Sequence, residues 1–191
     1  MSGLSRRAGR GGPLSPAPAG SVPAGERQRG MASPDEFRAL MSGFPTGVAV
    51  VAAADADGTP RGMTCSSLCG VSLEPPVLLV CLRQGSPTLD AVLGSAGFAV
   101  NLLHSGARGT AELFASGDPR RFERVPWETG PEASGPHLTR DAHSVADCGV
   151  RLAQRMGDHV SVYGEIRRVT RRGERVPLLY GMRQFRTWPL A

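Results

Sequence analysis

Residues 47–68 read GVAVVAAADADGTPRGMTCSSL, and this stretch does most to decide the class of fold. Gly47–Ala54 is an apolar run, Asp55–Gly58 holds turn-forming residues, and Pro60–Leu68 is a second extended segment. Two extended segments joined by such a short turn are typical of an antiparallel hairpin. The stretch therefore predicts a β-hairpin.

Further short strands are predicted beyond this hairpin, at Val77–Leu82, Phe98–Leu103, Val145–Met156, His159–Thr170, Pro177–Tyr180 and Phe185–Trp188. Val77–Leu82 is continuously apolar, which is typical of a strand buried on both faces, whereas apolar and polar residues alternate in His159–Thr170. Short helices are predicted after Ser86 and around Ala107–Ala115. Six or seven short strands with two or three small helices favour a mainly β fold, a closed or partly closed β-barrel, over a sheet of βαβ units.

The ordered domain is predicted to begin at Ser33, the first residue of the capping box Ser-Pro-Asp-Glu. The hydroxyl of Ser33 can accept from the N–H of Glu36, whose carboxylate can reach back to Ser33. Pro34 takes the first helical position, where its missing N–H costs nothing. The resulting helix ends near Gly43 and carries three apolar residues on one face, Phe37, Leu40 and Met41.

The length of 191 residues favours one domain with a single core. Residues 1–30 are a mixture of Gly, Pro, Ser and Arg with almost no large apolar residue. We therefore expect a disordered basic tail at residues 1–32 before a domain at 33–191. An alternative is that the true start of the protein is Met31.

The positive charge is unevenly distributed, and all 22 basic residues are Arg. Of the formal net charge of +5, +4 lies in residues 1–30 and +1 in the rest of the chain. A nearly neutral domain argues against binding to nucleic acid.

No apolar run approaches the roughly 18 residues that span a bilayer, and the N-terminal stretch lacks the apolar segment of a signal peptide. Four cysteines are scattered along the chain: Cys65, Cys69, Cys81 and Cys148. They form none of the paired spacings typical of structural zinc, so no metal is expected. We predict buried thiols in a reducing compartment, and hence a cytoplasmic protein without membrane contact.

Small polar residues cluster at the end of the second extended segment. They belong to the segment that consists of Gly62, Met63, Thr64, Cys65, Ser66 and Ser67. They offer short hydroxyl groups and close access to backbone amides, as binding of an anion or of a ring edge requires. An ordinary polar strand end has the same composition, so both interpretations stand.

A second cluster follows the predicted strand Val77–Leu82 and consists of Arg83, Gln84, Gly85, Ser86, Pro87 and Thr88. Ser86 and Pro87 would open a helix whose free N–H groups point at whatever precedes them, and Arg83 adds a fixed positive charge. The cluster favours a phosphate site, with a plain helix cap as the alternative.

Gly157-Asp158-His159 lies between the two long late strands. Asp158 either orients the imidazole of His159 or shapes a turn. No Gly-x-Gly-x-x-Gly follows a strand, and no Gly-Lys-Ser/Thr loop exists because the chain has no Lys. A nicotinamide dinucleotide would therefore bind without a domain of its own.

Seven segments are specific as an ordered set, although each is weak alone: Phe44–Val51, Gly62–Leu68, Val71–Val77, Arg83–Thr88, Phe98–Leu103, Gly157–His159 and Pro177–Tyr180. In this order they resemble the flavin reductase family, whose fold is the FMN-binding split β-barrel. The resemblance covers about residues 34–188. It implies a homodimer with flavin near the subunit interface, and an enzyme that reduces FMN or FAD with NADH or NADPH. Reduced flavin would then diffuse to a separate partner monooxygenase.

The resemblance also implies roles for individual residues. Residues 62–67 would line the isoalloxazine ring and ribityl chain, and residues 83–90 would hold the phosphate. Asn101 would flank that pocket, and Asp158 would belong to the binding set. His159 would face the nicotinamide as the catalytic residue, and Tyr180 would help close the pocket.

The chain departs from the family pattern in two places. Cys65 and Leu68 stand where an apolar β-branched residue and an aromatic residue are more usual, which would loosen stacking near the ring. After Tyr180 the chain reads Gly-Met-Arg-Gln-Phe, where many relatives have another aromatic residue and a Gly before the Phe. This difference bears on the contacts to the nicotinamide.

Two other functions suit the same barrel. One is a flavoprotein that holds FMN tightly as an electron carrier without nicotinamide turnover, and the other is a direct reductase of an organic substrate. His159 favours the reductase, because a carrier does not need it.

Overall fold

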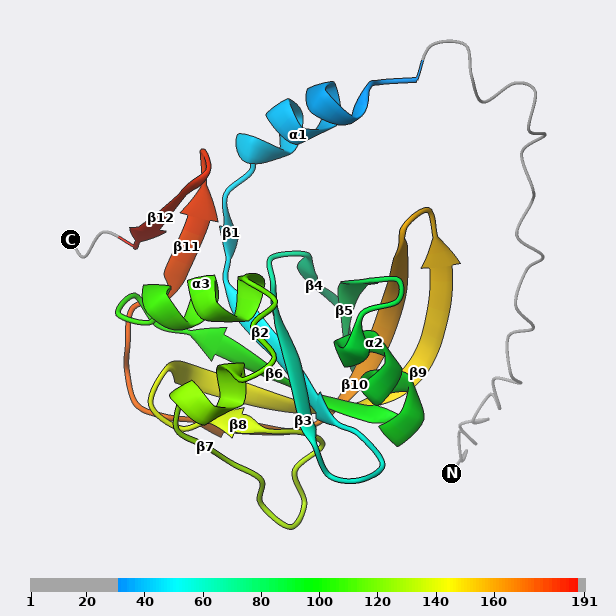
Figure 1. Ribbon diagram of the computed structural model, residues 1–191, viewed down its shortest axis with the longest axis vertical. Helices are drawn as coiled ribbons and strands as arrows, with labels where there is room; N and C mark the ends of the chain where they lie inside the picture. Colours follow the sequence, from blue (N-terminus) through cyan, green and yellow to red (C-terminus); the bar gives the residue numbers. More distant parts are fainter. Residues whose placement is uncertain (1–30, 189–191) are drawn as a thin grey trace, which may run out of the picture. The chain divides into compact units, whose positions relative to one another are not determined.

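The computed structural model describes residues 31–188, and it confirms the prediction of a mainly β fold with short helices (Figure 1). The helices are α1 (Pro34–Ser42), α2 (Pro87–Ser95), α3 (Arg108–Ala115) and the 3₁₀ helix η1 (Arg121–Arg124). The strands are β1 (Thr46–Gly47), β2 (Ala49–Ala54), β3 (Pro60–Cys65), β4 (Leu68–Leu73), β5 (Pro76–Arg83), β6 (Gly97–Leu103), β7 (Trp127–Glu128), β8 (His137–Leu138), β9 (Ala142–Met156), β10 (His159–Arg171), β11 (Leu178–Gly181) and β12 (Gln184–Thr187). The expected tail at residues 1–32 lies outside the described residues, apart from Met31 and Ala32.

Helix α1 begins at the predicted capping box. The N–H of Ser33 donates to Oε2 of Glu36 over 2.7 Å, and the N–H of Glu36 donates to Oγ of Ser33 over 3.2 Å. Pro34 is the first helical residue, and the helix ends at Ser42. The prediction of this helix is confirmed.

Seven strands form one antiparallel sheet in the order β3-β2-β6-β9-β10-β5-β4. Strands β3 and β4 are consecutive in the chain, yet they form opposite edges of this sheet and are separated only by Ser66 and Ser67. Strand β3 also contacts β5, so the sheet curls until its edges approach each other. The two edges do not pair by hydrogen bonds, which makes the architecture a split barrel.

Strand β4 corrects one prediction, because the extended segment expected to run from Pro60 to Leu68 ends at Cys65. The hydroxyl of Ser67 accepts from the N–H of Cys81 over 3.3 Å and donates to the carbonyl oxygen of Cys81 over 3.1 Å. These bonds attach the chain to β5 and direct the following residues along that strand.

Two apolar cores lie on the two sides of β2. Val50 and Ala52 pack with residues of α3 and η1 in one core, whereas Ala49 and Val51 pack with residues of α2 and β5 in the other. Strand β2 is therefore buried on both faces. The first of the two clusters includes α3 residues such as Phe114, and the second includes α2 residues such as Leu89.

The expectation that Val77–Leu82 is buried on both faces is wrong. Leu78, Val80 and Leu82 are buried in the core beneath α2, whereas the alternate residues Leu79 and Cys81 are half-exposed. Helix α2 packs on the inner face of β5 only, so the outer face of that strand keeps its apolar side chains partly in solvent.

This outer face carries a cross-strand row, which we call the outer row: Cys69 of β4, Leu79 of β5, Tyr163 of β10 and Leu152 of β9. The register pairs Cys69 with Leu79, Leu79 with Tyr163, and Tyr163 with Leu152. Directly paired residues project from the same face of a sheet. Leu152 is 53% exposed, and the last six residues of β9 are all exposed. A largely apolar row therefore faces outward.

A second, smaller sheet has the order β1-β11-β12. Gly181 pairs with Gln184, so Met182 and Arg183 make a two-residue turn. Their φ angles are 50° and 58°, in the left-handed region.

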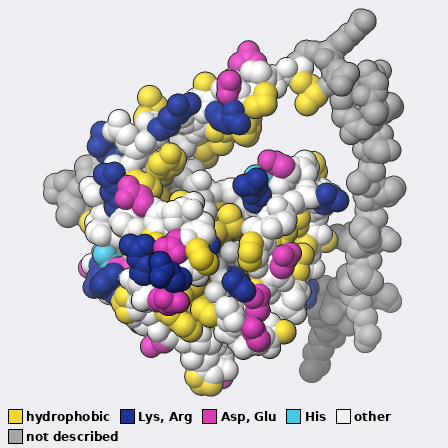
Figure 2. Space-filling model, viewed as in Figure 1, with side chains coloured by type: hydrophobic (Ala, Val, Ile, Leu, Met, Phe, Trp, Pro, Cys, Tyr) yellow, Lys and Arg dark blue, Asp and Glu magenta, His cyan; other side chains and the backbone are white. Residues whose placement is uncertain are grey.

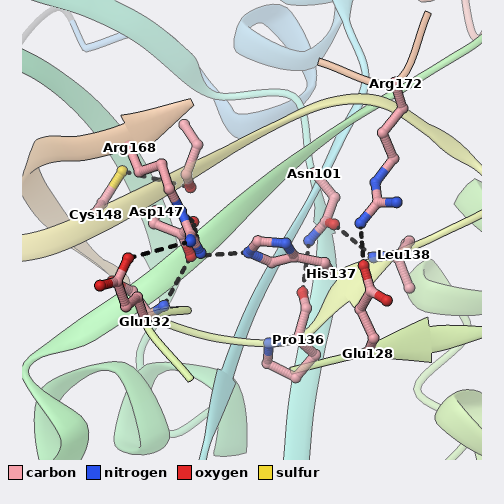
Figure 3. A network of polar contacts seen from close by, with 12 residues as sticks. Asn101, Glu128, Glu132, Pro136, His137, Leu138, Asp147, Cys148, Arg168 and Arg172 are labelled. Carbon is pink, nitrogen blue, oxygen red and sulfur yellow. Dashed lines mark hydrogen bonds and ion pairs between the residues drawn. The ribbon is translucent and has the colours of Figure 1, made fainter. Parts of the chain in front are cut away.

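A buried polar network ties the segment between β7 and β8 to the large sheet (Figure 3). Asp147, 1% exposed, accepts from Nε2 of His137 over 2.8 Å, from the N–H of Ser134 over 2.7 Å and from Nη2 of Arg168 over 3.0 Å. Burial raises the pKa of Asp147, but the hydrogen bonds and the positive charge outweigh burial and hold this pKa below its ordinary value.

The four cysteines are unpaired. Cys65 and Cys148 are buried as predicted, and burial raises the pKa of Cys148 to about 12. The prediction of burial is wrong for Cys69, which lies exposed on the edge strand β4, and for Cys81, which is half-exposed on β5. Among the helices described, none is long and apolar enough to cross a membrane.

Candidate functional site

Two adjoining cavities open along β3 and α3. The β3–α2 cavity has a volume of about 340 Å³ and is lined by Pro60, Arg61, Gly62, Met63, Arg83, Ser86, Pro87, Thr88, Phe114, Ala115, Gly117, Pro119 and Arg121. The α3–β11 cavity has a volume of about 440 Å³ and is lined by Val48, Thr64, Ser66, Glu112, Ala115, Ser116, Tyr180 and Phe185. Ala115, at the end of α3, lines both. The structure thus brings most of the predicted binding residues together, because successive residues of β3 face the two cavities.

The N-terminus of α2 forms one end of the β3–α2 cavity. Ser86 is the N-cap, and its Oγ accepts from the N–H of Leu89 over 3.3 Å. Pro87 has no N–H, so the amide of Thr88 is the one left for a ligand in the first turn. Several free amides were expected here, and the cap and the proline reduce them to one.

Three arginines surround this helix end. Arg83 is exposed at the end of β5, and Arg61 is paired with Asp55 over 2.6 Å. Arg121 donates through Nη1 to the carbonyl oxygen of Gly62 and through Nε to that of Asp118, both over 2.7 Å. Partial burial lowers the pKa of Arg121, and the nearby Asp118 carboxylate opposes this effect. The cavity therefore offers positive charge and hydrogen-bond donors to an anion.

The predicted phosphate-binding cluster at residues 83–88 is joined by hydrogen bonds to the Gly157-Asp158-His159 segment. Gln84 donates from Nε2 to the carbonyl oxygen of Gly157 over 2.5 Å, and its N–H donates to the carbonyl oxygen of Asp158 over 3.0 Å. Gly85 has φ 69° and Gly157 has φ 60°, conformations in which a side chain would be strained. Gln84 and Gly85 thus shape the loop that presents Arg83 and Ser86, and they do not line the cavity themselves.

The hydroxyl groups near β3 differ in their hydrogen bonds and in whether they line a cavity. Thr64 Oγ1 donates its proton to the carbonyl oxygen of Ala111 over 2.6 Å, so toward a ligand it can only accept. Ser66 is exposed in the α3–β11 cavity. Ser67 is engaged by the backbone of Cys81 and belongs to the barrel, not to the cavity. Cys65 is also outside both linings, and burial raises the pKa of its thiol.

Gly62 is needed at the wall of the β3–α2 cavity. A Cβ at this position would come within 3.0 Å of Phe122 and 3.1 Å of Phe114. The two rings pack edge to face, with centroids 5.0 Å apart. The absence of a side chain therefore lets β3 lie directly against this aromatic pair.

Tyr180 and Phe185 form the far wall of the α3–β11 cavity. Their ring centroids are 5.1 Å apart, and both residues come from the small sheet. The predicted place of Tyr180 at the pocket edge agrees with this lining, although its role with a ligand stays a prediction.

His159 lines neither cavity. It is the first residue of β10, its side chain is 44% exposed, and it pairs in register with Arg83. Its Nδ1 lies 2.9 Å from Oδ1 of Asp158, and this hydrogen bond lowers the pKa of Asp158. A carboxylate only accepts, so Nδ1 carries the hydrogen and Nε2 is left to face solvent or a ligand.

Asn101 is separated from both cavities. It is 0% exposed, and its side-chain amide donates to the carbonyl oxygens of Val50 and Pro136 and accepts from the N–H of Leu138 over 2.8 Å (Figure 3). These contacts hold β8 against the sheet. We therefore leave Asn101 out of the proposed binding set.

Several cavity residues were missed by sequence reasoning. Arg121 reaches the β3–α2 cavity from η1, and three residues at the end of α3 line the α3–β11 cavity: Glu112, Ala115 and Ser116. No motif marks them, because they reach β3 only through tertiary packing. Phe185 ends the segment Gly-Met-Arg-Gln-Phe, and the departure of this segment from the family pattern was the one available signal.

The two cavities fit the parts of a flavin. The basic β3–α2 cavity at a helix N-terminus suits a phosphate, and the α3–β11 cavity combines apolar walls with hydroxyl groups that suit a ring system with polar edges. The fit rests on residues of this chain alone.

Comparison with known proteins agrees with this fit. Residues 41–189 match the family described as "Flavin reductase like domain". A flavin reductase (NADPH) of Lentzea aerocolonigenes is 52% identical over 153 residues, which are 80% of this chain and 89% of the relative. The reductase subunit of a flavin-dependent monooxygenase of Rhodococcus jostii is 34% identical over 152 residues, 80% of this chain and 76% of that protein.

Among solved structures, the NADH:FAD oxidoreductase of Streptomyces globisporus, in complex with NAD and FAD fragments, is similar with a TM-score of 0.76. It is 30% identical, and the match covers 83% of this chain and 96% of that one. The family match over residues 41–189 includes the strands of the split barrel and the residues that line both cavities, and on these grounds the chain belongs to the flavin reductase family.

Proposed function

We propose that this protein is an NAD(P)H:flavin oxidoreductase that reduces FMN or FAD and supplies the reduced flavin to a partner monooxygenase. The observation that carries the proposal is the adjoining pair of cavities along β3, one basic at a helix N-terminus and one apolar with hydroxyl groups. A flavin has the corresponding parts, a phosphate-bearing chain and a planar ring. The relatives' activities and the Rhodococcus reductase subunit support the same conclusion.

The flavin and the nicotinamide supply the hydride chemistry when bound, so the protein has to bind, orient and exclude water. Arg83, the hydroxyl of Ser86 and the N–H of Thr88 would bind the flavin phosphate. Thr64 would accept a hydrogen bond at the ring edge, and Ser66 could donate or accept. Tyr180 and Phe185 would shield the flavin ring in the α3–β11 cavity from water.

We assign His159 the positioning of the nicotinamide. Its Nε2 is available, its Nδ1 is held by Asp158, and its register partner is Arg83, at the phosphate end of the proposed flavin site. In that place it could also relay a proton to bulk solvent.

A homodimer through the outer row is part of the proposal. Leu79, Tyr163 and Leu152 offer an apolar surface on the face of the sheet whose last β9 residues are all exposed. Arg83 and His159 pair with each other at the ends of β5 and β10, on the same face as Leu79 and Tyr163, so the dimer would bring the flavin site close to the subunit interface. The unpaired cysteines support a cytoplasmic location.

The test is oxidation of NADH and of NADPH by the purified protein, with and without free FMN or FAD. Oxidation that requires added flavin supports the reductase. Tight, copurifying flavin without nicotinamide oxidation would favour the electron carrier and would remove the role given to His159.

A further inference from the structure

A third cavity, which we call the basic cavity, adjoins the α3–β11 cavity. It has a volume of about 340 Å³ and shares Glu112, Tyr180 and Phe185 with its neighbour. Its remaining lining includes three arginines, Arg108, Arg183 and Arg186. Figure 2 shows dark-blue side chains, interspersed with magenta acidic ones, on the side of the molecule that carries α3 and the β11–β12 hairpin. A ligand in the α3–β11 cavity would therefore lie next to the positive charge of these arginines.

The charges of the basic cavity are only partly balanced. Arg108 pairs with Glu112 over 2.8 Å, and its guanidinium lies 5.8 Å from the centre of the Phe185 ring. Arg186 is held by the amide oxygen of Gln184, which is neutral. Arg183 has no ion-pair or hydrogen-bond partner within residues 31–188. Two guanidinium groups are thus left without a carboxylate.

Arg183 occupies a backbone conformation that does not favour arginine. Its φ of 58° lies in the left-handed region, and so does that of its neighbour Met182 at 50°. Two-residue hairpin turns of this kind prefer Asn and Gly. A strained residue at the rim of a cavity points to a use for its side chain.

We propose that Arg183 and Arg186, with Arg108 beside them, bind the 2′-phosphate of NADPH and make this enzyme prefer NADPH to NADH. The inference rests on the proposed function and specifies its hydride donor. The two nicotinamide dinucleotides differ only in that phosphate, a dianion on the ribose far from the reacting ring. Arginine is suited to it because the planar guanidinium can donate two hydrogen bonds to one phosphate. The nicotinamide would lie against the flavin ring at the opening of the α3–β11 cavity, and the adjoining basic cavity would take the phosphorylated ribose.

Binding without turnover provides the first test. Isothermal titration of the full chain with adenosine 2′,5′-bisphosphate and with adenosine 5′-monophosphate compares ligands with and without the 2′-phosphate. We expect tighter binding of the bisphosphate, weakened about tenfold in Arg183→Gly and in Arg186→Gln. Arg183→Gly also relieves the left-handed residue, so loss of the fold does not explain the effect. Met182→Gly relieves the same turn without removing charge and should bind as the parent protein does.

Kinetics provide the second test. Both arginine variants should raise the KM for NADPH by about tenfold and leave the KM for NADH within about twofold. An equal change for the two donors, or none for either, would overturn the inference. If the arginines served the diphosphate of FAD instead, the KM for FAD would rise while that for FMN and the NADPH-to-NADH ratio stayed constant. Flavin-dependent oxidation of NADH with no role for these arginines would sink this inference alone, whereas no oxidation of either donor would sink the proposed function.

Discussion

The side-chain amide of Gln84 donates to the carbonyl oxygen of Gly157 over 2.5 Å, across 73 positions of sequence. This bond fastens the loop that presents Arg83 and Ser86 to the turn between β9 and β10. We expect Gln84→Ala to loosen that loop and raise the KM for flavin by roughly threefold to tenfold, because one hydrogen bond between ordered segments is lost. Glu174→Ala, at an exposed position outside both cavities and outside the outer row, is the control. Steady-state kinetics at varied flavin concentration measure this KM. An unchanged KM for flavin would mean that Arg83 is held in place without Gln84.

His159→Ala should raise the KM for the nicotinamide more than the KM for flavin. The imidazole is proposed to position the donor, while the flavin phosphate relies on Arg83 and Ser86. Measuring both KM values on one preparation provides the internal control. Equal changes in the two values would assign His159 a role in the loop and not at the nicotinamide.

Leu152→Asp should convert a dimer into a monomer. A carboxylate at the β9 end of the outer row would be buried without a partner when two copies associate. Leu93→Asp on α2, where the leucine is 44% exposed and outside the outer row, serves as the matched control. Light scattering coupled to size exclusion gives the mass. A parent protein that is already monomeric, or a dimer that survives the substitution, would contradict the assigned interface.

Acid stability should depend on Asp147. Its folded-state pKa lies below the ordinary value, so its contribution is complete above about pH 4 and is lost as the pH falls through the folded-state pKa. Asp147→Ala should lower the free energy of unfolding at neutral pH by about 3 kcal/mol, because His137 and Arg168 lose a buried partner. The variant should also lose less stability than the parent between pH 5 and pH 3. Glu174→Gln, at an exposed carboxylate, should leave both the neutral stability and the acid profile unchanged.

Gly164→Ala should destabilise the barrel. A Cβ at this position would lie 2.5 Å from Cζ of Phe98 and 2.9 Å from Cβ of Cys148, and neither side chain has room to yield in the core. Overpacking of this kind costs about 1–3 kcal/mol, or several degrees of Tm. Gly70→Ala, on the edge strand β4, meets nothing within 4 Å and provides the comparison. The register of β10 and β9 is irregular between Tyr163 and Gly164, and thermal melts of similar midpoint for both variants would show that β10 shifts freely there.

The features that sequence alone predicted well are those encoded by neighbouring residues. The capping box at Ser33, the N-cap at Ser86 and the alternation in β10 depend on contacts within a few positions. The resemblance to a family added the split barrel, which no local pattern specifies.

The features that were missed depend on distant partners. Strand β4 exists because Ser67 binds the backbone of Cys81, and Asn101 became structural because β8 folds against it. Arg121 reaches Gly62 only after η1 has packed on β3. Each of these outcomes depends on a hydrogen bond between residues that are 14 or more positions apart in the sequence. The residues around each partner do not indicate such a bond.

The two edges of the large sheet are connected by Ser66 and Ser67 and by no ladder of hydrogen bonds. Such a connection works as a tether: it limits how far the edges can separate, yet it does not set their distance to a fraction of an ångström. A change in the distance between the two edges would therefore require bending of one continuous sheet, and no pair of hydrogen-bonded strands would have to separate.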